Sequence, residues 1–215
     1  MGRKNGNLHL NRRHSHCSAR RSSQFREGFL QQKTLRDSKH NIKTTERAML
    51  SNLYDKNPSR FIKSICPDGT IDTTIDSSLS FLFLFEAFDA KDQTVQTTMD
   101  SIAGKLWVKT EIGGLARYEG DYYKQTSKSL PGNPWFVCTL WLARWQIAQA
   151  TTLKELAKSL DLLTWATKRA TKSGILAEQL NPYDGAPVSV SPLIWSHAEF
   201  VIAVCQYLDK YRSFL

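Results

Sequence analysis

The chain has 215 residues, of which 41% are hydrophobic and 23% charged, enough for one domain with a core or for a piece of a larger fold. The longest apolar run, around residues 79–88, is far too short to cross a bilayer, and no apolar segment follows the N-terminus as in a secretory signal. These features argue against a membrane protein and predict a cytoplasmic location.

The net charge of +9 is concentrated in residues 1–40, which contain ten Lys or Arg against two acidic residues. The same stretch shows almost no apolar periodicity, so we expect it to be a basic, disordered arm. A nucleic-acid-binding tail is one function for such an arm, because many charges could release counterions from a phosphate backbone. His14, His16 and Cys17 have no fourth ligand at a usual spacing, so no structural metal is expected there.

Four cysteines, Cys17, Cys66, Cys138 and Cys205, are widely spaced along the chain. This spacing favours a reducing compartment. Cys138 and Cys205 fall in apolar helical patterns, where a buried free thiol packs as a small apolar side chain.

Helical signals begin after the arm. Residues 42–53 have an amphipathic pattern of about three turns. The stretch 73–88 is apolar on nearly every side, which predicts a helix buried all round, with a strand as the alternative for so aromatic a run. Asp92 can cap a third helix, whose apolar stripe consists of Val95, Met99, Ile102 and Leu106.

Three more helices are expected in the second half. Asn133-Pro134 reads as a cap and a first-turn proline before a helix with little polar face. Thr152 and Glu155 form a capping box for the fifth helix, which Gly174 should end. Its expected stripe is Leu156, Leu160, Leu163 and Thr167.

Ser191-Pro192 marks the start of the sixth helix. The residues of this helix that are expected to face the protein interior are Ile194, Ala198, Val201, Val204, Cys205 and Leu208.

Half-buried and buried helices therefore alternate, and long connections (about 56–72, 108–132 and 174–190) follow only the half-buried ones. Successive antiparallel helices put every second connection at the same end. The sequence predicts an all-α fold, a partial (α/α)6 toroid of about six helices that alternate between an outer and an inner ring, with functional loops on one rim. A plain helical bundle with long loops is the alternative.

The second long loop, GGLARYEGDYYKQTSKSLPGNPWF, gathers an arginine, carboxylates and aromatic residues. Arg117, Glu119 and Asp121 offer planar partners for hydroxyl groups, and Trp135 offers a ring on which the apolar face of a sugar can lie. The pattern is typical of a carbohydrate site, although such clusters also occur as structural networks at helix ends.

ARYEGDYY followed by PGNPWF, and then SGILAEQLNPYDGAPVSVSPLIWSHAEFV, resembles the C-terminal half of glycoside hydrolase family fifteen, the glucoamylase and glucodextranase group. DGTIDTTIDSSLSFLFLFEAF resembles the helix before them, so the resemblance runs from about residue 42 to the end. It implies the family's double ring of six inner and six outer helices, about half of which this chain would hold.

The resemblance also implies roles for residues. Glu178, in LAEQ, matches the catalytic general base, and Arg117 matches an arginine that contacts sugar hydroxyls. Trp135 matches an aromatic residue near the substrate pocket. The remaining binding candidates, which stand in matching motifs without a definite role, are Glu119, Asp121 and Gln179. Trp195 and His197 are expected to be a packing residue and a satisfied core histidine.

Inverting hydrolysis needs two carboxyl groups about 6.5–9.5 Å apart, an acid and a base. Nothing in residues 1–60 resembles the family's acid-bearing segment. We therefore expect a truncated or split C-terminal portion of an inverting α-glucan exo-hydrolase, inactive alone, with exposed apolar helix faces and no cofactor. Its partners would be an α-glucan or oligosaccharide and a complementary N-terminal polypeptide or a second copy. The alternatives are a non-catalytic helical sugar-binding or assembly subunit, and a nucleic-acid-associated protein.

Overall fold

The computed structural model describes residues 41–215. The expected basic arm, its nucleic-acid-binding role and the three potential zinc ligands lie outside the described residues. The chain divides into two units, residues 1–48 and 49–215. Residues 41–52 are helical, which confirms the first expected helix; the part up to residue 48 belongs to the first unit. The strands and helices from β1 to α6 all belong to the second unit.

Two small hairpins occupy most of the connection expected over 56–72. β1 (Tyr54–Lys56) pairs antiparallel with β2 (Ser59–Phe61), and β3 (Ser64–Ile65) pairs antiparallel with β4 (Ile71–Asp72). The first hairpin is attached to the core through Phe61, which is buried and donates its main-chain N–H to the Thr98 hydroxyl at 3.0 Å.

The prediction of a long buried helix over residues 73–88 is wrong. The segment begins extended, then forms the 3-10 turn η1 (Ser77–Ser80) and the single α-helical turn α2 (Phe81–Leu84). Asp76 stops a helix from starting earlier, because it is extended and accepts the Ser78 N–H as an N-cap. Glu86, with a φ of 58°, ends the turn, and Phe85 is 74% exposed rather than buried.

α3 (Gln93–Leu106) confirms the third expected helix. Asp92 caps it by accepting the Thr94 N–H, and the four residues of the predicted stripe are all buried. α4 (Phe136–Gln149) is buried on most sides, as predicted, but it begins with Trp135 as N-cap rather than at Asn133. The Asn133 side chain instead bonds to the loops around it.

α5 (Leu153–Arg169) has the predicted capping box, since the Thr152 hydroxyl accepts the Glu155 N–H at 3.2 Å. The predicted stripe is partly wrong. Leu160 is 40% exposed and Thr167 is exposed, while Ser159 and Ala166 are buried beside Leu156. The helix also stops at Arg169, before Gly174.

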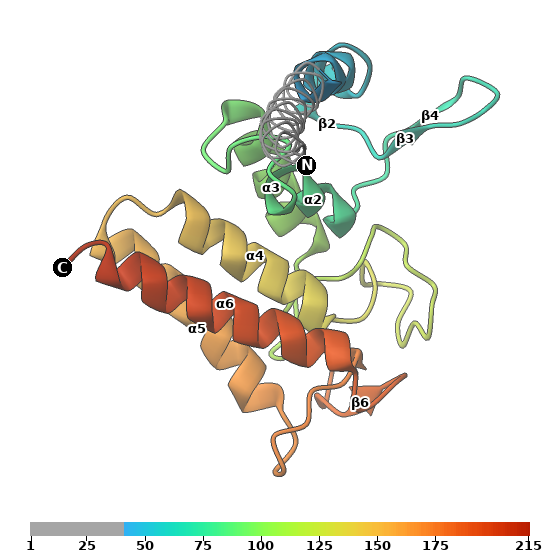
Figure 1. The fold of residues 1–215 in the computed structure, drawn as a ribbon. Coiled ribbons are helices and arrows are strands. Elements are labelled where there is room, and N and C mark those ends of the chain that lie inside the picture. The colour runs from blue at the N-terminus through green and yellow to red at the C-terminus, as the bar shows by residue number, and fades with distance from the viewer. Residues whose placement is uncertain (1–40) are drawn as a thin grey trace, which may run out of the picture. The chain divides into compact units, whose positions relative to one another are not determined.

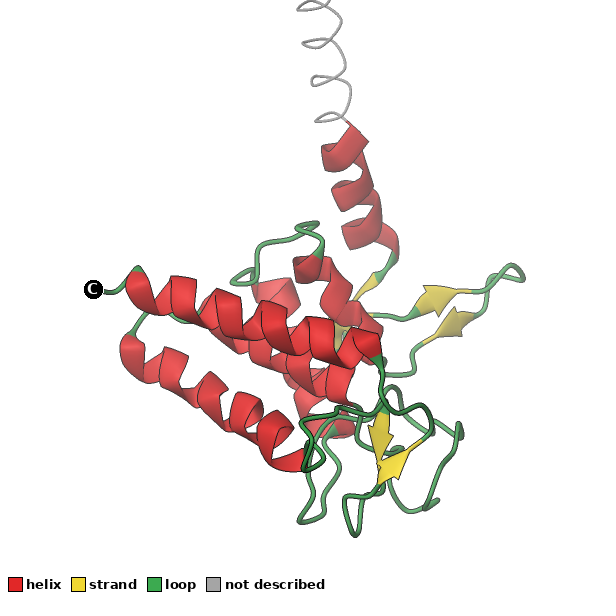
Figure 2. Cartoon of the chain, turned by 60° about the horizontal axis from the view of Figure 1, so that its bottom comes forward, coloured by secondary structure: helices red, strands yellow, loops and turns green. Residues whose placement is uncertain are grey.

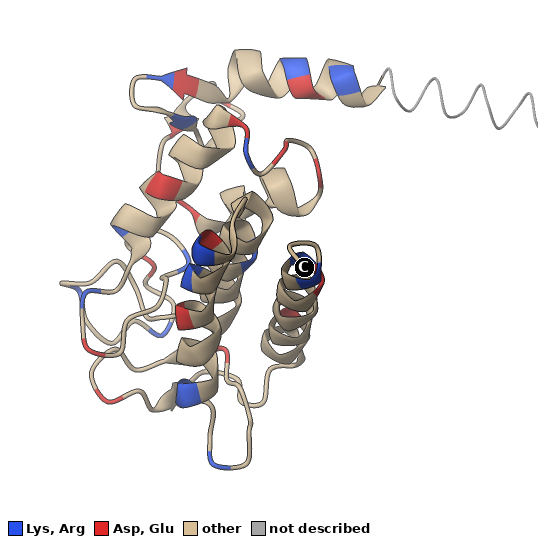
Figure 3. Ribbon diagram, turned by 90° about the vertical axis from the view of Figure 1, so that its left-hand side faces the viewer, with Lys and Arg blue, Asp and Glu red and all other residues tan. Residues whose placement is uncertain are grey.

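α6 (Ile194–Arg212) begins later than Ser191-Pro192, and its predicted inward face is wrong. The helix packs on α4 and α5 through another side, where Ser196, Glu199 and Ala203 are buried. The face expected inside is largely exposed, including Cys205, and no charged residue interrupts the sequence from Phe200 to Leu208 (Figure 3). The exposed large residues of this face are Ile194, Val201 and Leu208, and Ile202 beside them is also exposed.

Helices α4, α5 and α6 run side by side, and α4 contacts both others (Figure 1). The hairpin of β5 (Gln179–Leu180) and β6 (Pro187–Val188) lies with the long loops at one end of these helices (Figure 2). The rim expected for the second and third long connections is therefore present. Among residues 41–215 the strands form three two-stranded hairpins and no larger sheet. No helix within this described stretch has the length and apolar content to cross a membrane.

The corrected orientation of α5 can be tested by truncating two leucines of the same helix. Leu156→Ala should lower the free energy of unfolding by about 2–5 kcal/mol, because Leu156 is fully buried and its removal leaves a cavity. Leu160→Ala, on the exposed side, should cost less than about 1 kcal/mol. Urea unfolding measures both, and equal losses would contradict this orientation.

Candidate functional site

Short backbone bridges bring the rim segments together. Leu115 pairs with both Trp107 and Trp135, and Trp135 pairs with Gln179. The Trp135 N–H donates to the Leu115 carbonyl at 2.8 Å, and the Phe136 N–H donates to the Glu178 carbonyl at 3.3 Å. Arg117, Trp135 and Glu178, which are far apart in the sequence, are thereby held at one rim.

Gly114 allows this close approach. It has a φ of 94°, a conformation that suits glycine, and a Cβ there would lie 2.5 Å from Trp165 and 3.0 Å from Pro134. Any side chain would push the loop that carries Arg117 away from the start of α4.

The Arg117 guanidinium is held by the Asp121 carboxylate in a two-point interaction. Nε donates to Oδ2 at 3.0 Å and Nη2 donates to Oδ1 at 2.8 Å, and Asp121 is 1% exposed. Partial burial disfavours the arginine's charge, but the Asp121 carboxylate outweighs this and raises the pKa of Arg117. The arginine therefore stays cationic, and its planar head has a fixed direction.

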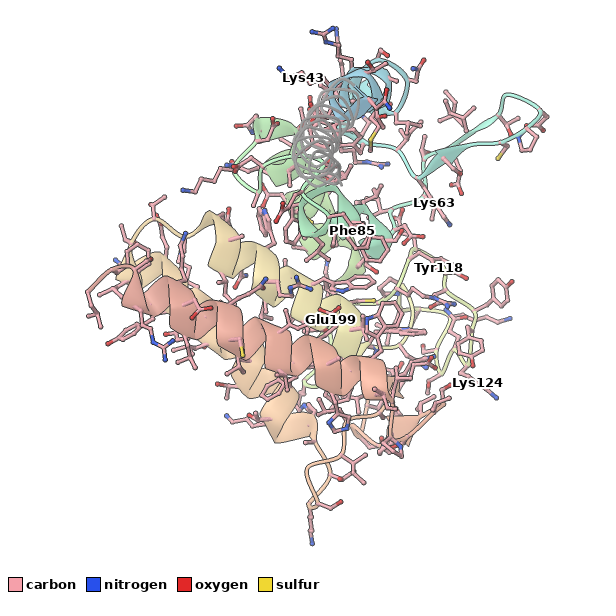
Figure 4. The ribbon with its side chains drawn as sticks, in the orientation of Figure 1. Lys43, Lys63, Phe85, Tyr118, Lys124 and Glu199 are labelled. Carbon is pink, nitrogen blue, oxygen red and sulfur yellow. The ribbon has the colours of Figure 1, made fainter. Side chains whose placement is uncertain are left out.

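Aromatic rings surround the same guanidinium. Its central carbon lies 4.7 Å from the Trp135 ring centre, 4.9 Å from that of Tyr118 and 5.4 Å from that of Tyr123. Lys63 reaches the Tyr118 ring from the β2–β3 connection, with Nζ 4.7 Å from the ring centre (Figure 4). Burial, with a further contribution from Asp121, raises the pKa of the Tyr118 phenol.

Glu178 is half-buried and stands one residue before β5. Its carboxylate accepts a long hydrogen bond, 3.4 Å, from the buried Gln179 side chain. The side-chain amide oxygen of Gln179 accepts a hydrogen bond from the Asn133 side chain at 3.0 Å. The Asn133 side chain also donates to the Lys124 main-chain carbonyl and accepts the Thr126 N–H. This chain of amides turns the NH₂ group of Gln179 toward Glu178.

A cavity of about 480 Å³ opens between these segments. The candidates Arg117, Trp135 and Glu178 all line it. A cavity of about 500 Å³ beside α3 and α4 is as large, so the choice of site depends on its side chains and not on its volume. The remaining lining residues are Asp76, Ser77, Ser78, Phe81, Tyr118, Val137, Cys138, Trp141 and Trp195.

The other three candidates do not line the cavity. Asp121 is occupied by Arg117, and Gln179 is buried behind Glu178. Glu119 is exposed and accepts the Ile75 N–H at 3.0 Å, which attaches its loop to the segment before η1. These three residues support the rim.

Sequence reasoning missed Asp76, Trp141 and Trp195 as cavity residues. Trp195 was expected to be a packing residue, but it is 48% exposed and faces the cavity because α6 presents a different side from the one predicted. His197 is the satisfied histidine that was expected, since its Nε2 accepts the Leu176 N–H at 3.0 Å. No sequence signal marked Trp141, which stands in an apolar run that reads as core.

The cavity wall contains a buried thiol. Cys138 accepts a hydrogen bond from the Ser77 hydroxyl at 3.1 Å, and burial raises the pKa of the thiol to about 12. Because the unfolded thiol ionises near its ordinary value of 9.0, this group's contribution to stability is complete below that pH and is lost as the pH rises toward 12. At neutral pH the thiol is a neutral packing group.

A fixed cation, a carboxylate and aromatic rings around one cavity suit a ligand rich in hydroxyl groups. The rings offer faces to apolar carbons, and the charged groups offer planar hydrogen-bond partners. Within residues 41–215 no group of three or more His, Cys, Asp or Glu side chains is placed to hold a metal ion.

Comparison with known proteins relates this arrangement to one family. The family model described as glycosyl hydrolases family 15 matches residues 29–205, so the match begins inside the basic segment. An uncharacterized glycosyl hydrolase of Methanocaldococcus jannaschii is 35% identical over 161 residues, which are 70% of this chain and 24% of that protein.

Two solved glucoamylases share the fold. A bacterial glucoamylase complexed with acarbose superimposes with a TM-score of 0.66 at 22% identity, covering 78% of this chain and 28% of that one. The family 15 glucoamylase from Hypocrea jecorina gives a TM-score of 0.57 at 18% identity, covering 75% and 36%. The predicted fold class is confirmed: the described residues are mostly helical and resemble part of the (α/α)6 fold. The chain spans about a quarter of the curated relative's length.

The carboxylate behind Arg117 should be important for stability. Asp121→Asn replaces one acceptor oxygen by an NH₂ group that faces the guanidinium, so the free energy of unfolding should fall by about 2 kcal/mol. Asp209→Asn is the matched control, because its ion pair with Arg212 is exposed and should be worth less than about 1 kcal/mol. Urea unfolding of both variants checks this, and losses of similar size would show that Arg117 does not depend on Asp121.

The buried thiol should resist alkylation. At pH 8 iodoacetamide should modify Cys205, which is exposed, and leave Cys138 unmodified until the protein is unfolded in urea. Mass spectrometry of the peptides reports each site separately. Rapid modification of Cys138 in the folded protein would contradict the burial described above.

Proposed function

Because the chain belongs to glycosyl hydrolase family 15, we propose that residues 41–215 are the C-terminal part of a glucoamylase-like catalytic domain, with Glu178 as the general base. The observation that carries this proposal is the cavity that Glu178 shares with Arg117 and Trp135. The bacterial glucoamylase of the same fold was crystallised with acarbose. The substrate class that we propose is an α-glucan, cleaved from its end with inversion.

In this mechanism Glu178 takes a proton from a water molecule that attacks the anomeric carbon. The hydrogen bond from Gln179 orients its carboxylate, and Asn133 orients Gln179 in turn. Arg117 donates hydrogen bonds to sugar hydroxyls with whichever N–H groups Asp121 leaves free, since Asp121 occupies Nε and Nη2. Trp135 supports the apolar face of the sugar ring.

The general acid has to come from outside residues 41–215. Asp76 is the only other carboxylate among the described residues that line the cavity. One of its oxygens accepts the Ser78 N–H at 2.9 Å and the other lies 3.4 Å from Lys63, so neither is available to protonate a leaving group. Inversion needs both carboxyl groups, and we therefore propose that the described part is inactive alone.

The exposed face of α6 supports a complementary polypeptide. Ile194 is 83% exposed, Val201 58% and Leu208 44%, and they follow one another along one side of the helix. A continuous apolar side of this kind marks an interface. We propose that the missing toroid helices, including the segment with the general acid, cover it. A second copy of the chain is the competing occupant.

A chimera tests the role of Glu178. Residues 41–215 would replace the matching segment of the M. jannaschii relative, and glucose release from maltotriose would be measured. Glu178→Gln should lower the rate about 10²–10⁴-fold, because the base is lost while the shape is kept. Glu119→Gln is the control and should leave the rate within about threefold, since Glu119 lies outside the cavity.

Equal rates for Glu178→Gln and the unmodified chimera would overturn the assignment of the base. The purified chain should release no glucose in the same assay. Hydrolysis by the chain alone, abolished by Glu178→Gln, would keep the base but overturn the need for a complementary polypeptide. The non-catalytic sugar-binding alternative predicts binding of maltotriose with no hydrolysis in either context.

A further inference from the structure

Two buried indole N–H groups lack a partner among residues 41–215, and both belong to the cavity of Glu178. They are those of Trp135, 6% exposed, and Trp141, 4% exposed. Leaving a buried donor unpaired costs about 1–3 kcal/mol, so native proteins usually pair such groups. Three other buried side-chain atoms without a partner, on Thr110, Gln146 and Arg169, lie elsewhere in the described part. The two indoles differ from these because they line the same cavity, and this shared position favours a ligand that brings acceptors.

The other tryptophans show what the fold does where no ligand is needed. Trp145 donates to the Ala90 carbonyl at 3.2 Å, Trp165 to the Ile112 carbonyl at 2.7 Å, and Trp195 to the Glu199 carboxylate at 3.2 Å. Each uses a donor–acceptor pair from within the described part of the chain. Trp141 has no such partner there although it is as buried as Trp145, with 4% and 5% of the two residues exposed.

The Trp141 ring has little freedom to turn toward another acceptor. It packs edge to face against Phe81, with ring centres 4.8 Å apart, and against Trp195, with ring centres 5.7 Å apart. Trp195 is itself held by Glu199, which forms a 2.8 Å ion pair with Arg144 of α4 (Figure 4). The indole is therefore fixed before any ligand arrives.

We propose that Trp141 is a further substrate-contacting residue, whose indole N–H donates a hydrogen bond to a hydroxyl oxygen of the bound sugar. This inference rests on the proposed function, because it takes an α-glucan as the occupant of the cavity. An indole is a donor only, and sugar hydroxyl and ether oxygens are acceptors, so the two match chemically. The Trp135 N–H is also buried and without a partner in the described residues, and it would donate to a second oxygen.

Such a contact also selects between substrates. A site with a buried donor rejects an analogue that lacks the matching oxygen, since the donor then stays unpaired. Removing that one hydroxyl from the sugar should therefore weaken binding to the unmodified chain far more than removing a hydroxyl elsewhere.

Calorimetry with maltotriose on the full chain tests the proposal. Trp141→Phe keeps an aromatic ring but removes the N–H, and should raise the Kd about tenfold, equivalent to about 1.4 kcal/mol. Trp165→Phe is the matched control, because it removes an indole N–H that already has a carbonyl partner outside the cavity, and its Kd should not change. Incorporating 3-benzothienylalanine at position 141, where sulfur replaces the N–H, repeats the test with the ring shape preserved.

Monodeoxy analogues of maltotriose separate a hydrogen bond from a packing effect. One analogue should bind the unmodified chain and the Trp141→Phe variant equally, because the oxygen that Trp141 contacts is absent. If Trp141→Phe weakens the binding of every analogue by the same factor, the residue only packs and the proposal is overturned.

Binding measurements distinguish a failure at Trp141 from a failure of the proposed sugar site. If maltotriose binds, Arg117→Ala weakens it, and Trp141→Phe matches Trp165→Phe, the inference about Trp141 is wrong and the proposed sugar site stands. If neither the unmodified chain nor the chimera described above binds maltotriose, the proposed function of the chain fails and the inference falls with it.

Discussion

The backbone bridges that join Leu115, Trp135 and Gln179 are the constraint on which the rim depends. Each consists of only one or two hydrogen bonds, yet together they connect three segments that are separated along the chain by a long loop and by two helices. Thr139 of α4 strengthens the junction, because its hydroxyl accepts the Leu115 N–H and donates to the Trp135 carbonyl. Without this junction the cavity would have no common wall.

The polar side chains around the junction are of two kinds. Some face the cavity, and others hydrogen-bond to these and fix their orientation. Arg117 and Glu178 face it, while Asp121 and Gln179 stand behind them, buried and hydrogen-bonded. A side chain that has to meet a ligand in one orientation needs such support, because a free arginine or glutamate samples many rotamers. The same support holds Trp195, whose indole N–H donates to Glu199 on the next turn of α6.

The helices around the site differ in how much of their surface is buried. α4 is buried on most sides and forms the centre, whereas α6 covers it with one side and turns an apolar side to the solvent. The exposed apolar side of α6 and the cavity that contains Glu178 are the two observations behind the proposal that a further polypeptide completes the fold and the site.

Local signals in the sequence were sufficient for the helical class, the caps at Asp92 and Thr152, and three of the residues that line the cavity. Caps and apolar periodicity are read over a few neighbouring residues, and the family motifs keep their order along the chain. The break in the expected helix at Asp76, the outward face of α6 and the cavity positions of Trp141 and Trp195 needed the three-dimensional arrangement. Each depends on contacts between distant segments: an apolar residue is equally apolar whether its helix turns it toward a neighbour, a ligand or the solvent, and only packing decides which of these it meets.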